Sequence, residues 1–158
     1  MPATLRHRNL PQLMLQAREA LMAQFRPVLH DHGVTEQQWR VLRTLLQHGP
    51  REPHQLCTAC RISSPSITGV LLRMQGAGWL TRERVDADQR RVRVSLTARG
   101  RQLAQRIAPD IEARYQQIER AVGVGALQQV HDALDTLLAA LEAAPSESEE
   151  APAARRRP

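Results

Sequence analysis

The sequence predicts a mostly α-helical chain that carries one small β-hairpin. A short helix is expected to begin at Ser64-Pro65, because a serine N-cap accepts hydrogen bonds from the first free amides and proline fits the first helical position. Residues 91–96 then alternate between polar and apolar side chains, the period of a strand with one buried face. This order is that of a winged helix-turn-helix, whose helix fits the major groove of DNA and whose hairpin reaches the neighbouring minor groove.

The predicted helix has one apolar face and one face of small, polar side chains. The apolar face is formed by Ile67, Val70, Leu71 and Met74. A recognition helix contacts bases mainly through its N-terminal residues, where small hydroxyl side chains allow close approach. The residues of this segment expected at DNA are Ser63, Ser64, Pro65, Ser66, Thr68 and Arg73. Gly76 and Gly78 are expected to end the helix. The alternative is an ordinary amphipathic surface helix.

The predicted hairpin joins strands at 79–85 and 91–96 through a charged loop with an arginine at its tip. We expect Arg84, Arg90 and Arg91 to contact DNA, because the forked donors of arginine suit phosphates and its charge suits a narrow minor groove. Asp88 is assigned to holding an arginine of the hairpin in place. The alternative is a solvated surface hairpin.

Positive charge is concentrated in the predicted reading segment. Residues 61–101 hold nine arginines and three acidic residues, a balance of +6 that equals the formal charge of the whole 158-residue chain. Clustered positive charge of this kind is typical of phosphate binding. All 22 basic residues are arginine, which we attribute in part to genomic base composition.

Further helices are expected on both sides of this segment. They cover 10–32, the stretch after Thr35 to about Gly49, 52–60, and 97 to about 122, with a last helix after Gly123 and Gly125. Thr35 followed by Gln38 is a capping-box pattern, and Thr97 is expected to cap the long helix. The helix at 52–60 would pack against the recognition helix.

The last predicted helix has an apolar stripe typical of an interface between helices. Its members recur at alternating spacings of three and four and are Leu127, Val130, Leu134, Leu137 and Leu141. We expect such helices to pack against a second copy, with intramolecular packing as the alternative. The expected parts are an N-terminal dimerisation helix (1–34), a winged helix-turn-helix DNA-binding domain (35–99), C-terminal dimerisation helices (100–144) and a disordered tail (145–158).

Several other classes of protein are not favoured by the sequence. It has no run of eighteen apolar residues and no signal-peptide pattern at its start, so a cytoplasmic protein is expected. It has no nucleophile elbow, phosphate-binding glycine loop or carboxylate pair, so we expect no enzyme and no cofactor. The six histidines are scattered and form no metal-ligand spacing.

Cys57 and Cys60 form a CxxC pattern, which elsewhere marks redox chemistry or half of a zinc site. No second such pattern is present, and an intact helix gives poor geometry for a disulfide bond between these positions. Free structural thiols are the favoured interpretation. A redox-sensing repressor switched through the two cysteines is the alternative function.

Beyond these patterns, the chain closely resembles the MarR family of winged-helix transcriptional regulators. The motifs that carry the resemblance are DQR at 88–90 and VSLTARG at 94–100, and it covers about residues 9–143. The phrases TEQQWRVLR at 35–43 and SPSITGVL at 64–71 are similar to the branch that contains the homoprotocatechuate-degradation regulator.

This resemblance implies a homodimer that binds palindromic promoter DNA and represses until a small aromatic carboxylic acid releases it. It also implies that Arg90 enters the minor groove and that Asp88 braces the hairpin. Effectors of the family bind between the first two helices, the dimer helices and the DNA-binding lobe.

Four residues are candidates for binding such an effector: Arg18, Met22, Trp39 and Arg40. An arginine can hold a carboxylate through two parallel hydrogen bonds, while tryptophan or methionine can cover an aromatic ring. The alternative is that Trp39 belongs to the core and that Arg18 is a buried salt-bridge partner, for example of a glutamate.

Overall fold

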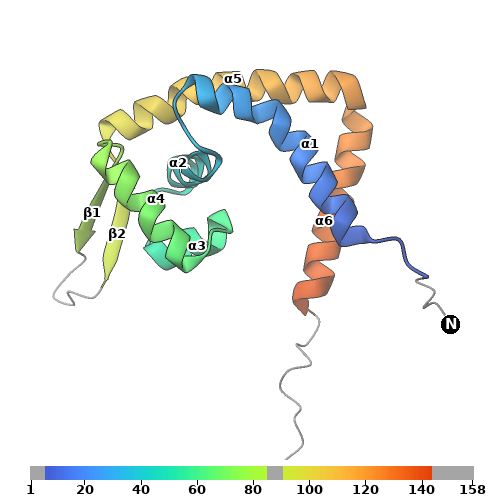
Figure 1. Cartoon of the computed structure of the whole chain (residues 1–158), viewed down its shortest axis with the longest axis horizontal. Coiled ribbons are helices and arrows are strands. Elements are labelled where there is room, and N and C mark those ends of the chain that lie inside the picture. The colour runs from blue at the N-terminus through green and yellow to red at the C-terminus, as the bar shows by residue number, and fades with distance from the viewer. Residues whose placement is uncertain (1–5, 85–90, 144–158) are drawn as a thin grey trace, which may run out of the picture. The chain divides into compact units, whose positions relative to one another are not determined.

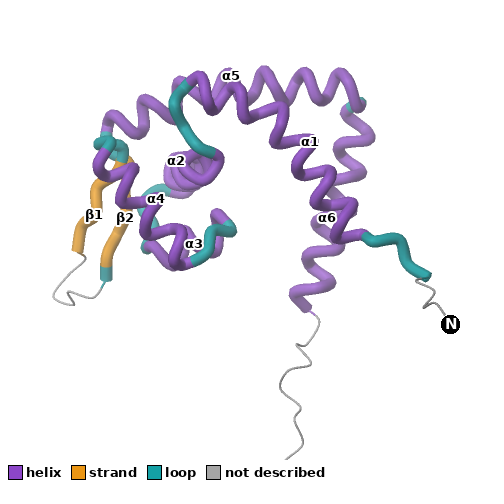
Figure 2. The backbone as a smooth tube through the Cα atoms, viewed as in Figure 1, coloured by secondary structure: helices purple, strands orange, loops and turns teal. Residues whose placement is uncertain are grey.

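The computed structural model describes residues 6–84 and 91–143 of the chain. The elements in chain order are α1 (Leu10–Asp31), α2 (Glu36–His48), α3 (Pro53–Cys60), α4 (Ser64–Gly76), β1 (Leu80–Arg84), β2 (Val92–Leu96), α5 (Ala98–Val122) and α6 (Val124–Ala143). The mostly helical fold with a single hairpin is confirmed (Figures 1 and 2). The predictions for Asp88, Arg90 and the tail from residue 145 lie outside the described residues.

Predicted capping residues begin several of these helices. Thr35 accepts a hydrogen bond from the amide of Gln38, and the Gln38 side chain accepts one from the amide of Thr35. The capping box therefore satisfies two amides that the first turn of α2 leaves free. At α1 the side chain of Asn9 accepts from the amide of Gln12 at 3.0 Å.

A core of apolar side chains holds α2, α3, α4 and the hairpin together. Its fully buried members include Leu42, Leu56, Ile67, Leu71, Met74 and Val94. They come from α2, α3, α4 and β2, so each of these elements fixes the position of the others. Figure 1 shows α4 (green) between α3 and the hairpin.

The start of α4 differs in detail from the prediction. The N-cap is Ser63 rather than Ser64, and its hydroxyl donates to Ser66 Oγ at 2.9 Å instead of accepting from a backbone amide. The predicted position of the N-cap was therefore wrong by one residue. The predicted role of its hydroxyl was also wrong, because the hydroxyl bonds to Ser66 and not to a backbone amide. Gly76 ends α4, and Gly78 (φ 73°) turns the chain toward β1.

The hairpin is antiparallel, with Leu80 opposite Leu96 and Arg84 opposite Val92. A short segment outside the two predicted strands adds to the outer edge of β2. Arg51 and Val94 exchange two backbone hydrogen bonds, of 3.1 and 2.8 Å, as an isolated bridge. The turn between α2 and α3 is thereby attached to the hairpin.

The first turn of α5 is bound closely to the turn that precedes β1. Thr97 Oγ1 accepts from the amide of Gly100 at 2.9 Å and donates to the carbonyl of Gly78 at 2.7 Å, which confirms Thr97 as the cap. Gly100 is buried against the backbone of Trp79. A Cβ at residue 100 would lie 2.0 Å from the Trp79 carbonyl oxygen, so only glycine fits.

Two contacts join α1 to α5. The rings of Phe25 and Tyr115 lie with centroids 4.7 Å apart, tilted by 51°. His32, at the C-terminal end of α1, lies with Nε2 2.7 Å from a carboxylate oxygen of Asp110. These contacts fix the C-terminal half of α1 along the middle of α5.

The chain packs as two units, one ending at Tyr115 and the other beginning at Gln116. The four parts expected from the sequence were divided by their expected roles in dimerisation and DNA binding, not by packing. That division remains a prediction. Gly123 separates α5 from α6, but Gly125 lies inside the first turn of α6, so the prediction that the last helix begins after Gly125 was wrong. No helix in the described ranges 6–84 and 91–143 is long and apolar enough to cross a membrane.

Candidate functional site

The outward face of α4 carries the residues predicted at DNA. Each of the six, Ser63, Ser64, Pro65, Ser66, Thr68 and Arg73, is exposed. The opposite face is buried through Ile67, Val70, Leu71 and Met74. The buried face fixes the position of the helix, and the hydroxyls near its N-terminus are exposed to solvent. Their contact with bases remains a prediction.

Arg84 and Arg91 flank the loop of the hairpin, and both are exposed. Arg91 Nε donates to Glu52 Oε1 at 3.0 Å, and Nη2 contacts the same oxygen. The Arg91 guanidinium holds the pKa of the Glu52 carboxyl below its usual value. Glu52 is the N-cap of α3, so this ion pair attaches the start of β2 to the helix-turn-helix.

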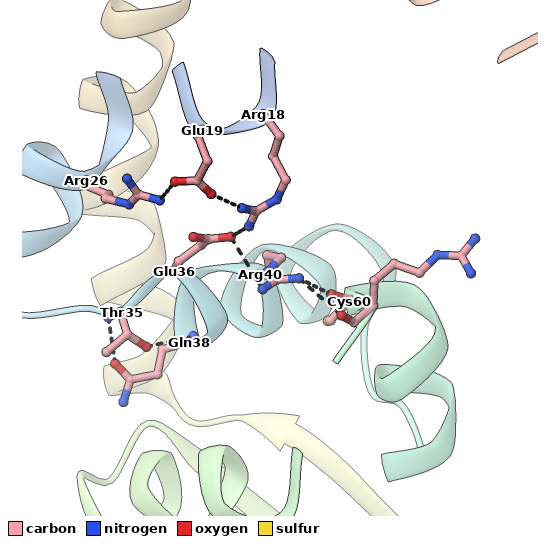
Figure 3. A network of polar contacts seen from close by, with 9 residues as sticks. Arg18, Glu19, Arg26, Thr35, Glu36, Gln38, Arg40 and Cys60 are labelled. Carbon is pink, nitrogen blue, oxygen red and sulfur yellow. Dashed lines mark hydrogen bonds and ion pairs between the residues drawn. The ribbon is translucent and has the colours of Figure 1, made fainter. Parts of the chain in front are cut away.

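Two of the four predicted effector residues, Arg18 and Arg40, lie in a chain of polar contacts that runs from α1 through α2 to the end of α3 (Figure 3). Arg18 contacts Glu19 at 2.7 Å and also binds Glu36 through Nη2. Glu36 lies 3.5 Å from Arg40, one turn further along α2. Two arginines from different helices therefore meet at one carboxylate.

Arg40 continues this chain of contacts to the helix-turn-helix. Its Nη1 donates to the carbonyl of Cys60 at 2.6 Å and to that of Arg61 at 3.4 Å. Arg61 has a left-handed backbone (φ 49°), a conformation that costs a non-glycine residue on the order of 1 kcal/mol. Arg40 thus stabilises the turn between α3 and α4 by binding the carbonyl of Arg61, the residue with the unfavourable backbone conformation.

The structure brings together part of the predicted effector set. Trp39 is buried, with 9% of its surface exposed, and Met22 is half-buried. Arg18 pairs with glutamates as the alternative interpretation expected, but it is exposed rather than buried. Glu36 was missed as a member of this site. Its position four residues before Arg40, the spacing of a helical ion pair, was the available signal.

The two cysteines are free thiols in the structure, with Cys57 half-buried and Cys60 buried. Thr44 Oγ1 lies 3.5 Å from Cys60 Sγ, and burial raises the pKa of the Cys60 thiol. The thiolate is the form that peroxides oxidise, so a raised pKa slows that reaction. In the described part of the chain, no three His, Cys, Asp or Glu residues are grouped so that they could hold a metal ion.

We expect hydrogen peroxide to leave DNA binding unchanged in the wild type and in the Cys57→Ser/Cys60→Ser double variant. A mobility-shift titration with and without peroxide measures this, with binding after added dithiothreitol as the control. Release of the wild type alone would favour the redox alternative.

The fold is a winged helix-turn-helix, which is the fold of a DNA-binding regulator. Its parts are the helix pair α3 and α4, joined by a tight turn, and the antiparallel hairpin that follows α4. A model of the MarR family matches residues 32–91. The chain is 40% identical to the HTH-type transcriptional regulator FarR of Neisseria gonorrhoeae, over 78% of this chain and 84% of the relative. It is 39% identical to the homoprotocatechuate degradative operon repressor of Escherichia coli, over 84% and 90%.

Among solved structures, NadR in complex with 4-hydroxyphenylacetate superposes with a TM-score of 0.75 at 39% identity, covering 87% of this chain and 97% of that one. The chain therefore belongs to the MarR family of transcriptional regulators, as its sequence motifs indicated.

Proposed function

We propose that the protein is a cytoplasmic homodimeric repressor that binds a palindromic promoter site and is released by a small aromatic carboxylic acid. The observation that carries this proposal is the meeting of Arg18 and Arg40 at the single carboxylate of Glu36, on the helix that also carries the buried Trp39. A relative with 39% identity has been solved in complex with 4-hydroxyphenylacetate, a ligand of the same chemical class.

A ligand carboxylate would compete with Glu36 for Arg18. The side chain of Arg18 is about half exposed, so a ligand can reach it without unfolding α1. Arg40 Nε is buried and, within the described part of the chain, has no hydrogen-bond partner. Buried donors normally find an acceptor, and a ligand oxygen would supply one.

The homodimer is supported by the surface of α6. None of its residues is buried, and the exposed apolar side chains include Val130, Leu134, Leu138 and Leu141. An apolar stripe of this extent on a helix surface favours association. A twofold dimer would place two α4 helices about one DNA turn apart, which favours a palindromic site.

Release would follow from a shift between two dimer shapes. A ligand changes DNA affinity only if it binds one of these shapes more tightly than the other. Arg40 connects the ligand's expected position to the carbonyls that precede α4. A change at Glu36 therefore has a direct structural path to the recognition helix.

Arg18→Ala is expected to keep operator binding and to lose release by the acid, because the ligand loses its charge-assisted hydrogen bonds. The loss should raise the acid concentration for half-release by roughly tenfold to a hundredfold. The measurement is a mobility shift on DNA upstream of the protein's own gene, with a panel of aromatic carboxylic acids.

Arg26→Ala is the matched control for this experiment. Arg26 lies on the same helix, is exposed to the same degree and also pairs with Glu19, at 2.6 Å, but it has no ion pair with Glu36. Arg26→Ala should therefore be released like the wild type. Normal release of Arg18→Ala would remove Arg18 from the ligand site, and specific binding that no acid releases would overturn the proposed effector class.

A further inference from the structure

One large apolar side chain, that of Leu72, stands on the outward face of α4. It is 62% exposed, more than any other large apolar residue described in the first unit. Burying a leucine side chain is favourable by about 1.5–3 kcal/mol, so leaving it in solvent forgoes stabilisation. A partner that covers Leu72 would recover it.

Leu72 lies near the middle of the face that opposes the core. Pro65 is two helical turns before it, Gly69 is three residues before it and Gly76 is four residues after it, so all lie along one strip of the helix surface. The buried residues Ile67, Val70, Leu71 and Met74 occupy the other side. The centre of the outward face therefore holds one proline and two glycines, with Leu72 as the largest side chain along the strip.

Polar groups stand on either side of this strip. Arg73 folds back along the helix, so that a Cβ at Gly69 would lie 3.3 Å from its Nη1. Thr68, one turn before Leu72, donates its hydroxyl hydrogen to the carbonyl of Ser64 at 3.4 Å. An apolar centre beside a cation and a hydroxyl suits a surface that meets base edges and phosphates together.

We propose that Leu72 is a specificity-determining residue that contacts the 5-methyl group of a thymine in the operator. In the major groove every base pair presents hydrogen-bonding atoms, but only thymine adds an apolar group. A leucine has neither donor nor acceptor, so the thymine methyl is the feature that it can recognise. This inference rests on the proposed DNA binding.

The charge of the surrounding segment favours DNA over a second copy of the chain at this face. Residues 61–101 have a formal balance of +6. Packing this surface against its own copy would bring like charges together, which is unfavourable. The negative phosphates of DNA complement the same surface.

The test replaces each operator thymine, one at a time, by deoxyuridine, which lacks only the methyl group. The operator is first located by footprinting DNA upstream of the gene. Wild-type protein should lose about threefold to tenfold in affinity at one position of each half-site. Leu72→Ala removes the contact in both half-sites, so it should bind the unmodified operator about tenfold to a hundredfold more weakly. It should no longer distinguish thymine from uracil at these positions.

Two matched variants separate this contact from general effects. Arg73→Ala, on the neighbouring position, should weaken binding to both operators equally and keep the ratio between them. Leu72→Met, which retains an apolar side chain of similar length, should restore much of the ratio. Circular dichroism and sedimentation should show Leu72→Ala folded and with unchanged oligomeric state.

Three outcomes would overturn the inference: a wild type indifferent to uracil at every position, a Leu72→Ala variant that keeps the full ratio, or a changed oligomeric state of that variant. Each leaves sequence-specific DNA binding intact. Failure of the wild type to bind any upstream site specifically is a separate result, which would overturn the proposed function as well.

Discussion

Gly100→Ala is expected to destabilise the protein by about 3 kcal/mol or more, the upper part of the range for overpacked sites. The added Cβ would lie 2.0 Å from the carbonyl oxygen of Trp79 and 2.9 Å from its carbonyl carbon. Both are backbone atoms and cannot rotate away as a side chain could. Relief requires the first turn of α5 to move, which breaks the hydrogen bonds of Thr97 to Gly100 and Gly78.

Urea unfolding followed by circular dichroism measures this loss. Gly125→Ala is the matched control, since Gly125 also lies in the first turn of a helix but a Cβ there would meet nothing within 4 Å. It should be neutral or stabilising by up to about 1 kcal/mol, because alanine favours helix. Equal stabilities of the two variants would show that the Trp79 backbone yields without cost.

The second large effect is expected for Arg40→Met, which keeps an apolar stem of similar length and removes the guanidinium. We expect the free energy of unfolding to fall by about 2 kcal/mol, because charged donors to the carbonyls of Cys60 and Arg61 are lost. The turn before α4 then loses its support from α2. Operator affinity should fall up to about tenfold, since 1.4 kcal/mol corresponds to a factor of ten.

Arg43→Met removes the same charge from the same helix at an exposed position. It should change stability by no more than about 0.5 kcal/mol. Urea unfolding measures the stability of the two variants, and mobility shifts measure their operator affinity. Both variants lose one positive charge, so any difference between them is due to the contacts of Arg40 with the turn before α4. If both variants behave alike, Arg40 acts only through its charge.

Much of this fold could be predicted because its signals are local. The capping box at Thr35, the cap at Thr97 and the alternation along 91–96 each depend on residues within a few positions of one another. Helix positions and the hairpin followed from them. The family could also be predicted, since it rests on motifs that the sequence shows directly.

The features that were missed depend on residues distant in sequence or on competition between partners. The bridge of Arg51 to Val94 joins segments that no periodicity relates. Ser63 is the N-cap of α4, but its hydroxyl donates to Ser66 instead of accepting from a backbone amide. Glu36 lies in the first turn of the helix predicted after Thr35, and only the packing of α1 on α2 reveals its ion pair with Arg18. The exposure of Leu72 is likewise visible only once the core is known.

The tight packing at Gly100 has a mechanical consequence for α5. The helix is clamped at this end to the turn before β1, and fifteen residues later Tyr115 lies against Phe25 of α1. The two points are about 22 Å apart at 1.5 Å per residue. If α5 tilted by about 5° about its end at Gly100, Tyr115 would move by roughly 2 Å. Helix shifts in switching proteins are of this size. Because α5 is attached at both points, we expect a displacement of α1 to change the angle between α5 and the hairpin.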